Sequence, residues 1–351
     1  MKAHEIDADD VFFDSLRDGY PEFGHWWRTK CVKEHRSCWV VYDKERLAGL
    51  VVRKDEDAAE TDAVTKAEKI LKICTFKVGP ESRGVKLGEL LLKQVLWFAQ
   101  RNGYDLAYLT TYDDQVALME LLEYYGFRNA GKNPKGEHIY ERDFSTEALS
   151  SLGSKTDFEQ ARENYPRFVV DDSTLGFGIP IKEGYHDTLY PDLYRPIQED
   201  LFGGASRADT ITRPGNTIRK VYLCRAQSKL GSAGSLLFFY KSTSKNPPSQ
   251  SITALGVLES VTLASSTKDL MQLTGGRSVY SEEQLEEWEA TSEHPVKVIN
   301  YLLVSYIEPA VSIDELRTMG VIKGHPQQSI YKLSHELIAG LVERANLEFE
   351  V

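Results

Sequence analysis

The chain has 351 residues, a net charge of −11 and 41% hydrophobic residues, which predicts a globular protein of two domains. It contains no run of eighteen or more apolar residues, which excludes a transmembrane helix, and we expect no signal peptide, because its first residues lack a basic and an apolar region. The four cysteines form no C-x-x-C pair, which argues against a disulfide framework or a structural zinc site and predicts a cytoplasmic location.

Positive charge is concentrated in one window of the sequence. Residues 191–250 carry nine lysines and arginines against four acidic residues, a net charge of +5 that leaves −16 for the rest of the chain. The overall charge argues against indiscriminate binding of nucleic acid. The local excess indicates a surface for an anionic partner or, equally, a solvated face that balances an acidic domain.

The first seventy residues predict a short strand, an amphipathic helical region from Val11 to about His35, and a hairpin. The hairpin strands are 37–42 and 47–52, joined by a polar turn. The acidic, alanine-rich stretch 55–66 predicts an exposed loop or a short helix.

A strand, a short polar loop and a long helix follow between residues 72 and 103. The run 73–78 is rich in β-branched and aromatic residues and is closed by Gly79-Pro80. The helix carries apolar residues at i, i+3, i+4 and i+7 spacing and stops at Asn102-Gly103. Small residues and unpaired N–H groups at a helix start make an anion site. The alternative is a strand–turn–helix unit that binds no ligand.

Three further elements complete the N-terminal half. The run 106–111 predicts a strand parallel to 73–78, joined to it through the helix in a βαβ crossover. A helix is expected from about Gln115 to Tyr125, closed by Gly126-Phe127, and a last strand at 139–142.

The loop Arg83-Gly84-Val85-Lys86-Leu87-Gly88 resembles the cofactor loop of the GNAT acetyltransferases, which has the pattern Q/R-x-x-G-x-G/A between a central strand and a long helix. Lys86 replaces the central glycine of the pattern, where its side chain would crowd a pyrophosphate or its ammonium would pair with a phosphate. The order of the predicted elements over roughly residues 1–145 also matches this family. The resemblance implies an α/β (α+β) GNAT fold with a mixed central sheet, acetyl-CoA as cosubstrate and an amine as acceptor.

The resemblance also implies a cofactor site. Backbone groups of Cys74, Thr75, Phe76 and Val78 would hold the pantetheine arm, although Cys74 is also read simply as a small buried apolar residue. The N–H groups of Arg83, Gly84, Val85, Lys86, Leu87 and Gly88 would bind the pyrophosphate, and no metal is needed.

The catalytic acid and base are less well marked. The tyrosine that usually serves as the acid falls at Leu122, so the candidates are Tyr125, one turn further along the helix, and Tyr112, at the end of the neighbouring strand. The alternative for both is a packed or rim aromatic residue. Glu68, before the strand, is the candidate base, with an ordinary surface acid as its alternative.

The second half of the chain differs in composition. Small polar residues around 145–155 predict a linker, and short β-rich runs at 167–170, 220–224, 236–240, 254–258 and 296–307 predict a small barrel with helices at 281–288, 312–319 and 333–346. We expect domains at 1–146 and 181–351, joined over 147–180 by a linker and a connecting strand.

The runs 215–224 and 234–241 resemble strands of PUA-like domains of the ASCH/EVE type, and 324–330 would close one rim of the pseudo-barrel. The resemblance covers roughly 180–346 and implies a smaller β-rich domain that binds RNA or modified bases. Cations alternate here with aromatic residues, as in single-strand binding, and the candidates are Arg219, Lys220, Arg225, Tyr240 and Lys241. The alternative places the apolar members in the barrel core and the cations in solvent.

Together the two resemblances predict an acetyl-CoA-dependent N-acetyltransferase whose C-terminal domain recruits RNA or an RNA-associated substrate, with a toxin-like role left open. The alternative is a nucleic-acid-binding regulatory protein whose GNAT domain binds CoA without efficient catalysis. The residues His186-Asp187 and His325 suggest a hydrolase, but no serine or cysteine lies in a nucleophile-elbow context.

Overall fold

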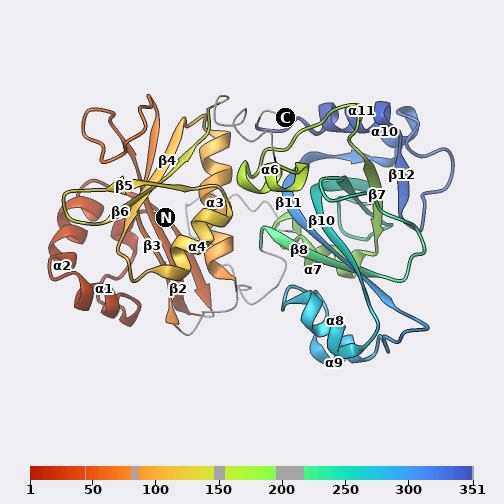
Figure 1. Ribbon diagram of the computed structural model, residues 1–351, viewed down its shortest axis with the longest axis horizontal. Helices are drawn as coiled ribbons and strands as arrows, with labels where there is room; N and C mark the ends of the chain where they lie inside the picture. The colour runs from red at the N-terminus through yellow and green to blue at the C-terminus, as the bar shows by residue number, and fades with distance from the viewer. Residues whose placement is uncertain (44, 81–85, 146–154, 195–216, 350–351) are drawn as a thin grey trace. The chain divides into compact units, whose positions relative to one another are not determined.

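The computed structural model describes residues 1–43, 45–80, 86–145, 155–194 and 217–349 and divides into two compact units (Figure 1). The described residues up to 145 form the N-terminal unit, and those from 155 onward form the C-terminal unit. None of the helices that the structure describes is long and apolar enough to cross a membrane.

The N-terminal unit begins with short helical pieces. They are η1 (Ala3–Glu5), η2 (Val11–Phe13), α1 (Asp14–Gly19), α2 (Phe23–Trp26) and the π-helix η3 (Trp27–Val32). The predicted N-terminal strand is wrong: the Glu5 carboxylate accepts the Lys2 N–H and closes a 3-10 turn, so that Lys2 contributes a single bridge to Ser37. Phe13 and Trp27 are buried and join these pieces to the sheet in one apolar cluster.

A six-stranded sheet forms the centre of this unit, in the order β1-β2-β3-β4-β6-β5. Its strands are β1 (Ser37–Asp43), β2 (Arg46–Glu56), β3 (Ile70–Val78), β4 (Leu106–Thr111), β5 (Arg128–Lys132) and β6 (His138–Asp143). The β3–β4 pair is parallel, as predicted, and the other pairs are antiparallel. Sequence reasoning missed β5, because Arg-Asn-Ala-Gly-Lys contains no β-branched or aromatic residue and lies largely exposed.

Two longer helices follow the central strands. Helix α3 (Leu87–Arg101) crosses from β3 to β4 and buries Leu91, Val95 and Leu96 completely. It ends at Asn102, and Gly103 adopts a positive φ of 60°, which glycine tolerates at a helix end. Helix α4 (Val116–Tyr124) follows β4. Both helices agree with the apolar spacing in the sequence.

The C-terminal unit is built on a second six-stranded sheet, in the order β12-β7-β9-β10-β11-β8. Its strands are β7 (Gly176–Ile181), β8 (Arg219–Cys224), β9 (Leu236–Lys241), β10 (Ser251–Ala264), β11 (Val296–Ser312) and β12 (Tyr331–Leu333). Its helices are α6 (Asp157–Glu163), α7 (Glu183–Leu189), η5 (Pro191–Tyr194), α8 (Thr267–Thr274), α9 (Glu282–Glu286), α10 (Ile313–Thr318) and α11 (His335–Ala345). The sheet is strongly curved, and the Tyr222 hydroxyl on β8 donates to the carbonyl of Pro180 on β7 at 3.2 Å, which links its two sides.

One prediction for this half of the chain needs correction. The run 167–170 forms no strand, and the strand that pairs with β9 is β7, whose two glycines and proline hid it from sequence reasoning. From residue 155 onward, the stretch expected to connect the domains belongs to the C-terminal unit, where it supplies α6 and β7. The predicted linker at 146–154 lies outside the described residues, and the predicted domain limits stay predictions.

Candidate functional site

The two parallel strands of the N-terminal sheet are paired over only a short length. Ile70, Leu71 and Lys72 on β3 pair with Leu106, Ala107 and Tyr108 on β4, and no further pair joins these described strands. Beyond Lys72, β3 continues to Val78 and stays paired with β2 alone. We call the side of residues 73–78 that faces β4 the open edge. Backbone N–H and C=O groups on such an edge require hydrogen-bond partners from water or a ligand.

Cys74 lies on the open edge and forms a β-bulge. Val52 pairs with Thr75 and Arg53 with Ile73, so that Cys74 is the extra residue on β3. The Arg36 guanidinium donates to its Sγ at 3.3 Å, and burial raises the pKa of the Cys74 thiol. This thiol is therefore a packed side chain and not an activated nucleophile.

Helix α3 begins close to the end of β3 in the chain, with Lys86 as its N-cap residue. Lys86 has φ of 64° and ψ of 22°, the left-handed conformation that glycine adopts most readily. Leu87 is buried, and a Cβ on Gly88 would lie 3.2 Å from Leu121 Cδ2 on α4, so only a small residue fits there without displacing that side chain. Arg83, Gly84 and Val85 lie outside the described residues.

The carboxyl ends of β3 and β4 point in the same direction, because the strands are parallel. Val78, the start of α3 and Tyr112, which directly follows β4, therefore belong to one edge of the sheet. Of the predicted site residues, the structure brings together Cys74–Val78 on the open edge, Lys86–Gly88 at the helix start and Tyr112 beside them in the topology.

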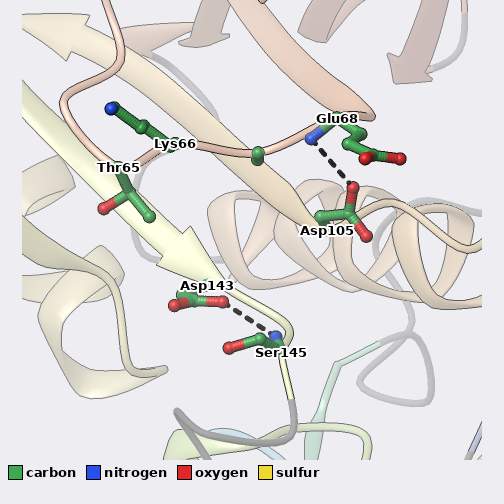
Figure 2. A pocket seen from close by; sticks show the side chains of 7 residues that line it. Thr65, Lys66, Glu68, Asp105, Asp143 and Ser145 are labelled. Atoms are coloured by element: carbon green, nitrogen blue, oxygen red, sulfur yellow. Dashed lines mark hydrogen bonds between the residues drawn. The ribbon is translucent and has the colours of Figure 1, made fainter.

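Glu68 lies at the opposite end of β3. Its N–H and that of Lys69 donate to Asp105 Oδ2 at 3.2 and 2.8 Å, and its side chain is exposed (Figure 2). It lines an open cavity of about 360 Å³ whose other residues are Thr65, Lys66, Ala67, Asp105, Asp143 and Ser145. A strand rises about 3.3 Å per residue, so the carboxyl end of β3 lies roughly 25 Å away. The structure does not bring Glu68 to the open edge.

A buried polar cluster marks the point at which β3 and β4 separate, and sequence reasoning missed it. The Tyr108 hydroxyl donates to Glu56, whose carboxylate also contacts Lys54 at 2.7 Å and Lys72 at 3.2 Å. Burial alone would raise the pKa of Glu56, but hydrogen bonds from Lys54, Tyr108 and Lys72 lower it. Burial and the bond to Glu56 raise the pKa of Tyr108 to about 12. This carboxylate is ionised and is bound by Tyr108, Lys54 and Lys72. It therefore stabilises the point at which β3 and β4 separate and is a weak base.

Residues 2–127 match the family model described as the acetyltransferase (GNAT) family. The N-terminal unit is a GNAT domain. Over 103 residues the chain is 32% identical to N-acetyltransferase 8B of Homo sapiens, covering 29% of this chain and 43% of that protein. The chain thus spans less than half of the length of the curated relatives it matches.

Solved structures are similar at a lower level. ASCH from Zymomonas mobilis has 17% identity and a TM-score of 0.33, covering 48% of this chain and 94% of that one. PaiA N-acetyltransferase of Thermoplasma acidophilum, solved with coenzyme A, has 14% identity and a TM-score of 0.29, covering 38% of this chain and 86% of that one. The predicted fold class, a GNAT domain with a mixed sheet followed by a β-rich unit, is confirmed.

Tyr125 of the GNAT domain is buried, and its hydroxyl donates to Glu89 Oε1 at 2.8 Å. Glu89 lies in the first turn of α3 and is itself buried. To protonate a leaving group, Tyr125 would have to release this carboxylate. Sequence reasoning missed Glu89, because Glu89 and Lys93 at i and i+4 look like an ordinary surface pair. Leu122, at the position of the usual acid, is fully buried.

Three of the five predicted nucleic-acid-binding residues of the C-terminal unit lie in its interior. Lys220 is buried and donates to the Leu189 carbonyl at 2.7 Å, and Lys241 is buried with its Nζ 2.7 Å from Asp187 Oδ1. Tyr240 is buried as well, and burial raises its pKa. The expectation that strand cations face solvent fails at both lysines, because the interior offers each of them an oxygen partner.

The two arginines of the predicted set are more accessible. Arg219 forms a two-point ion pair with Glu259, at 2.9 and 2.5 Å. Arg225 is exposed, donates to the carbonyl of Trp288 and lies 5.8 Å from the centre of its indole ring. Arg225 is thus the predicted residue that the structure leaves best placed to contact a partner.

His186 belongs to a buried array that resembles a catalytic triad in geometry alone. Its Nε2 lies 2.7 Å from Thr253 Oγ1 and its Nδ1 lies 3.1 Å from Asp187 Oδ1. Thr253 and His186 are both fully buried, so no substrate reaches them, and burial lowers the pKa of His186. His325 is exposed and outside this array. Among the described residues, no group of three or more His, Cys, Asp or Glu is arranged to hold a metal ion.

Proposed function

We propose that the protein is an acetyl-CoA-dependent N-acetyltransferase that acts on an amine acceptor. The observation that carries the proposal is the separation of β3 and β4 beyond Lys72 and Tyr108. A pantetheine arm is an extended chain with two amide groups. It would add to the open edge of Ile73–Val78 as an extra strand, exchanging backbone hydrogen bonds as peptides do in β-augmentation.

The start of α3 would hold the pyrophosphate of the cofactor. The first N–H groups of a helix lack partners within the helix and lie at the positive end of its dipole, which favours an anion. Lys86, Leu87 and Gly88 are the described residues at this position. The family match over residues 2–127 supports acetyl-CoA as the cosubstrate.

The reaction joins an uncharged amine to the acetyl group. The nitrogen attacks the thioester carbonyl carbon, the new N–C bond forms, the C–S bond breaks, and the thiolate leaves. The acceptor ammonium gives up one proton before the attack and the amide nitrogen a second one after it, of which the thiolate takes one and the base or solvent the other. Tyr112 is the candidate acid that lies exposed at the carboxyl edge of the sheet, whereas Tyr125 is held by Glu89.

Thermal unfolding of the full chain with increasing acetyl-CoA tests the proposal. A ligand at about one hundred times its Kd stabilises the folded state by roughly 2.7 kcal/mol. We expect a rise in Tm with acetyl-CoA and with CoA, together with an acetylated amine detected by mass spectrometry. An unchanged Tm at saturating cofactor would contradict the proposal and the assignment of the open edge as the binding site of the pantetheine arm.

A second candidate function is a regulatory protein whose GNAT domain binds CoA without efficient turnover. The buried Tyr125–Glu89 bond and the leucine at position 122 favour it, because neither leaves a free phenol at the position of the usual acid. In that case, the Tm would rise with CoA while no amine becomes acetylated. Recruitment of RNA by the C-terminal unit and a toxin-like role stay predictions.

A further inference from the structure

Two tyrosines lie exposed and in contact at the carboxyl end of β4. Tyr112 follows β4 directly and Tyr20 follows α1, and their ring centroids are 5.8 Å apart with 35° between the ring planes. Tyr112 is 37% exposed and Tyr20 is 38% exposed. Each side chain therefore keeps part of its surface accessible to a ligand. Two elements distant in sequence thus present a joint aromatic face to solvent.

Two carboxylates, Glu137 and Asp114, act electrostatically on this aromatic pair. Burial and the negative charges of Glu137 and Asp114, with Tyr112 as a further contributor, raise the pKa of Tyr20 to about 12. Glu137 accepts from Asn133 Nδ2 at 2.7 Å and Asp114 from Gln115 Nε2 at 3.1 Å. Neither carboxylate has a cationic partner among the described residues.

The charges next to this pair leave it negative. Asp113 binds Lys132 at 3.2 Å and also contacts His138, so these three side chains satisfy one another. Lys135, exposed in the turn between β5 and β6, is the remaining described cation of that turn. On the other side, Tyr20 is flanked in the chain by Asp18 and Glu22, which are both exposed.

We propose that Tyr20, Tyr112, Asp114 and Glu137 bind the positive charge of the acceptor, which is an aliphatic amine with a second cationic group. This inference rests on the proposed function, because it places the acceptor at the end of the open edge. An ammonium over an aromatic face is attracted by the ring electrons, and unpaired carboxylates add to that attraction. One amine of the acceptor reacts uncharged, and the other stays an ammonium bound at this aromatic and acidic surface.

The test measures binding of 1,4-diaminobutane and 1-aminobutane to the full chain by isothermal titration calorimetry at low salt, without cofactor. At neutral pH both compounds are ammonium ions of the same chain length, and the diamine carries a second positive charge that 1-aminobutane lacks. We expect the diamine to bind about tenfold more tightly. Tyr20→Leu and Asp114→Asn each weaken its binding by about three- to tenfold and reduce its preference over 1-aminobutane, which carries a single ammonium.

Two control variants match these changes elsewhere on the surface. Tyr185→Leu removes an exposed tyrosine of the C-terminal unit that also contacts another ring, Tyr280. Glu120→Gln removes an exposed charge from α4. Neither control variant is expected to change diamine binding, and circular dichroism checks that all four variants are folded.

The outcomes separate this inference from the proposed function. Equal binding of the two amines, or equal effects in test and control variants, overturns the cationic acceptor while a Tm rise with acetyl-CoA still supports acetyl transfer. Preferential binding of the diamine that depends on Tyr20 and Asp114 supports the inference. If that preference holds but acetyl-CoA gives no Tm rise, the surface binds a cation and the proposed function fails.

Discussion

Lys86 occupies a backbone conformation that ordinarily belongs to glycine. A side chain in the left-handed region costs roughly 1–2 kcal/mol, and the family pattern has glycine at this position. A residue kept there despite this cost has either a role toward the cofactor or a tolerated strain. The sequence allowed two interpretations of Lys86. Crowding of the pyrophosphate would weaken the binding of the cofactor, whereas pairing with a phosphate would strengthen it.

Substitutions at Lys86 separate these readings. If the ammonium pairs with a phosphate, Lys86→Ala weakens acetyl-CoA binding by about three- to tenfold at low salt and Lys86→Arg retains it. Lys86→Gly also loses the charge but releases the backbone strain, so it weakens binding while raising the free energy of unfolding. The measurement is calorimetric titration with acetyl-CoA, with the exposed Lys33→Ala as a charge-matched control. Tighter binding by Lys86→Gly would instead establish crowding.

At the scale of secondary-structure elements, the correct predictions are the helices and strands that hydrophobic spacing determines. The parallel β3–β4 pair, α3, α4 and the strands around residues 220–224, 236–240 and 254–258 all follow local patterns that the structure keeps. Sequence reasoning missed β5 and β7, whose residues are poor strand formers and pair because their neighbours hold them in place.

The candidate site was predictable only in part, for a related reason. The loop pattern and the strand before it are local in sequence, so residues 73–78 and 86–88 could be named as a candidate site. Glu89, Tyr108 and Tyr20 act through partners on other elements, Glu89 with Tyr125, Tyr108 with Glu56, and Tyr20 with Tyr112. No spacing in one sequence encodes such long-range contacts. The inward Lys220 and Lys241 were misplaced for the same reason.

Gly256 lies at a strand position that has no room for a side chain, a requirement that the hydrophobic pattern of the strand does not reveal. A Cβ there would lie 2.7 Å from Tyr301 Cδ2 and 2.8 Å from the Leu302 carbonyl oxygen, and the buried Tyr301 is held by a 2.7 Å hydrogen bond to Tyr190. We expect Gly256→Ala to lower the free energy of unfolding by about 1–3 kcal/mol, measured by urea denaturation of the full chain. In Gly184→Ala, where no atom lies within 4 Å of the added carbon, the helix α7 should become no less stable. Equal effects of the two changes would contradict this account.

At the scale of the whole molecule, the described cations of the basic window do not all reach the surface. In the window 191–250, Lys220 and Lys241 are buried, and Arg219 is paired with Glu259. Arg195, Arg207 and Arg213 lie outside the described residues. A net charge counted along the chain therefore overstates the positive potential that the described surface presents to an anionic partner.

Binding of RNA provides the test at this scale. If the C-terminal unit recruits RNA through its accessible arginine, Arg225→Glu weakens binding and lowers the slope of log K against log salt by about one. The exposed Lys323→Glu in the same unit is the matched charge reversal and should have a smaller effect. Fluorescence anisotropy with a labelled single-stranded RNA measures both. Absence of binding by the unaltered chain at low salt would end the recruitment hypothesis.

The separation of β3 and β4 also affects how the protein resists aggregation before its cofactor binds. An unpaired strand flank inside a sheet can accept a foreign strand, the event that begins edge-to-edge aggregation. Under the proposed function, the pantetheine arm would occupy that flank. A cell with more coenzyme A would then accumulate less aggregated protein, so the cofactor would protect the fold as well as supply the acetyl group.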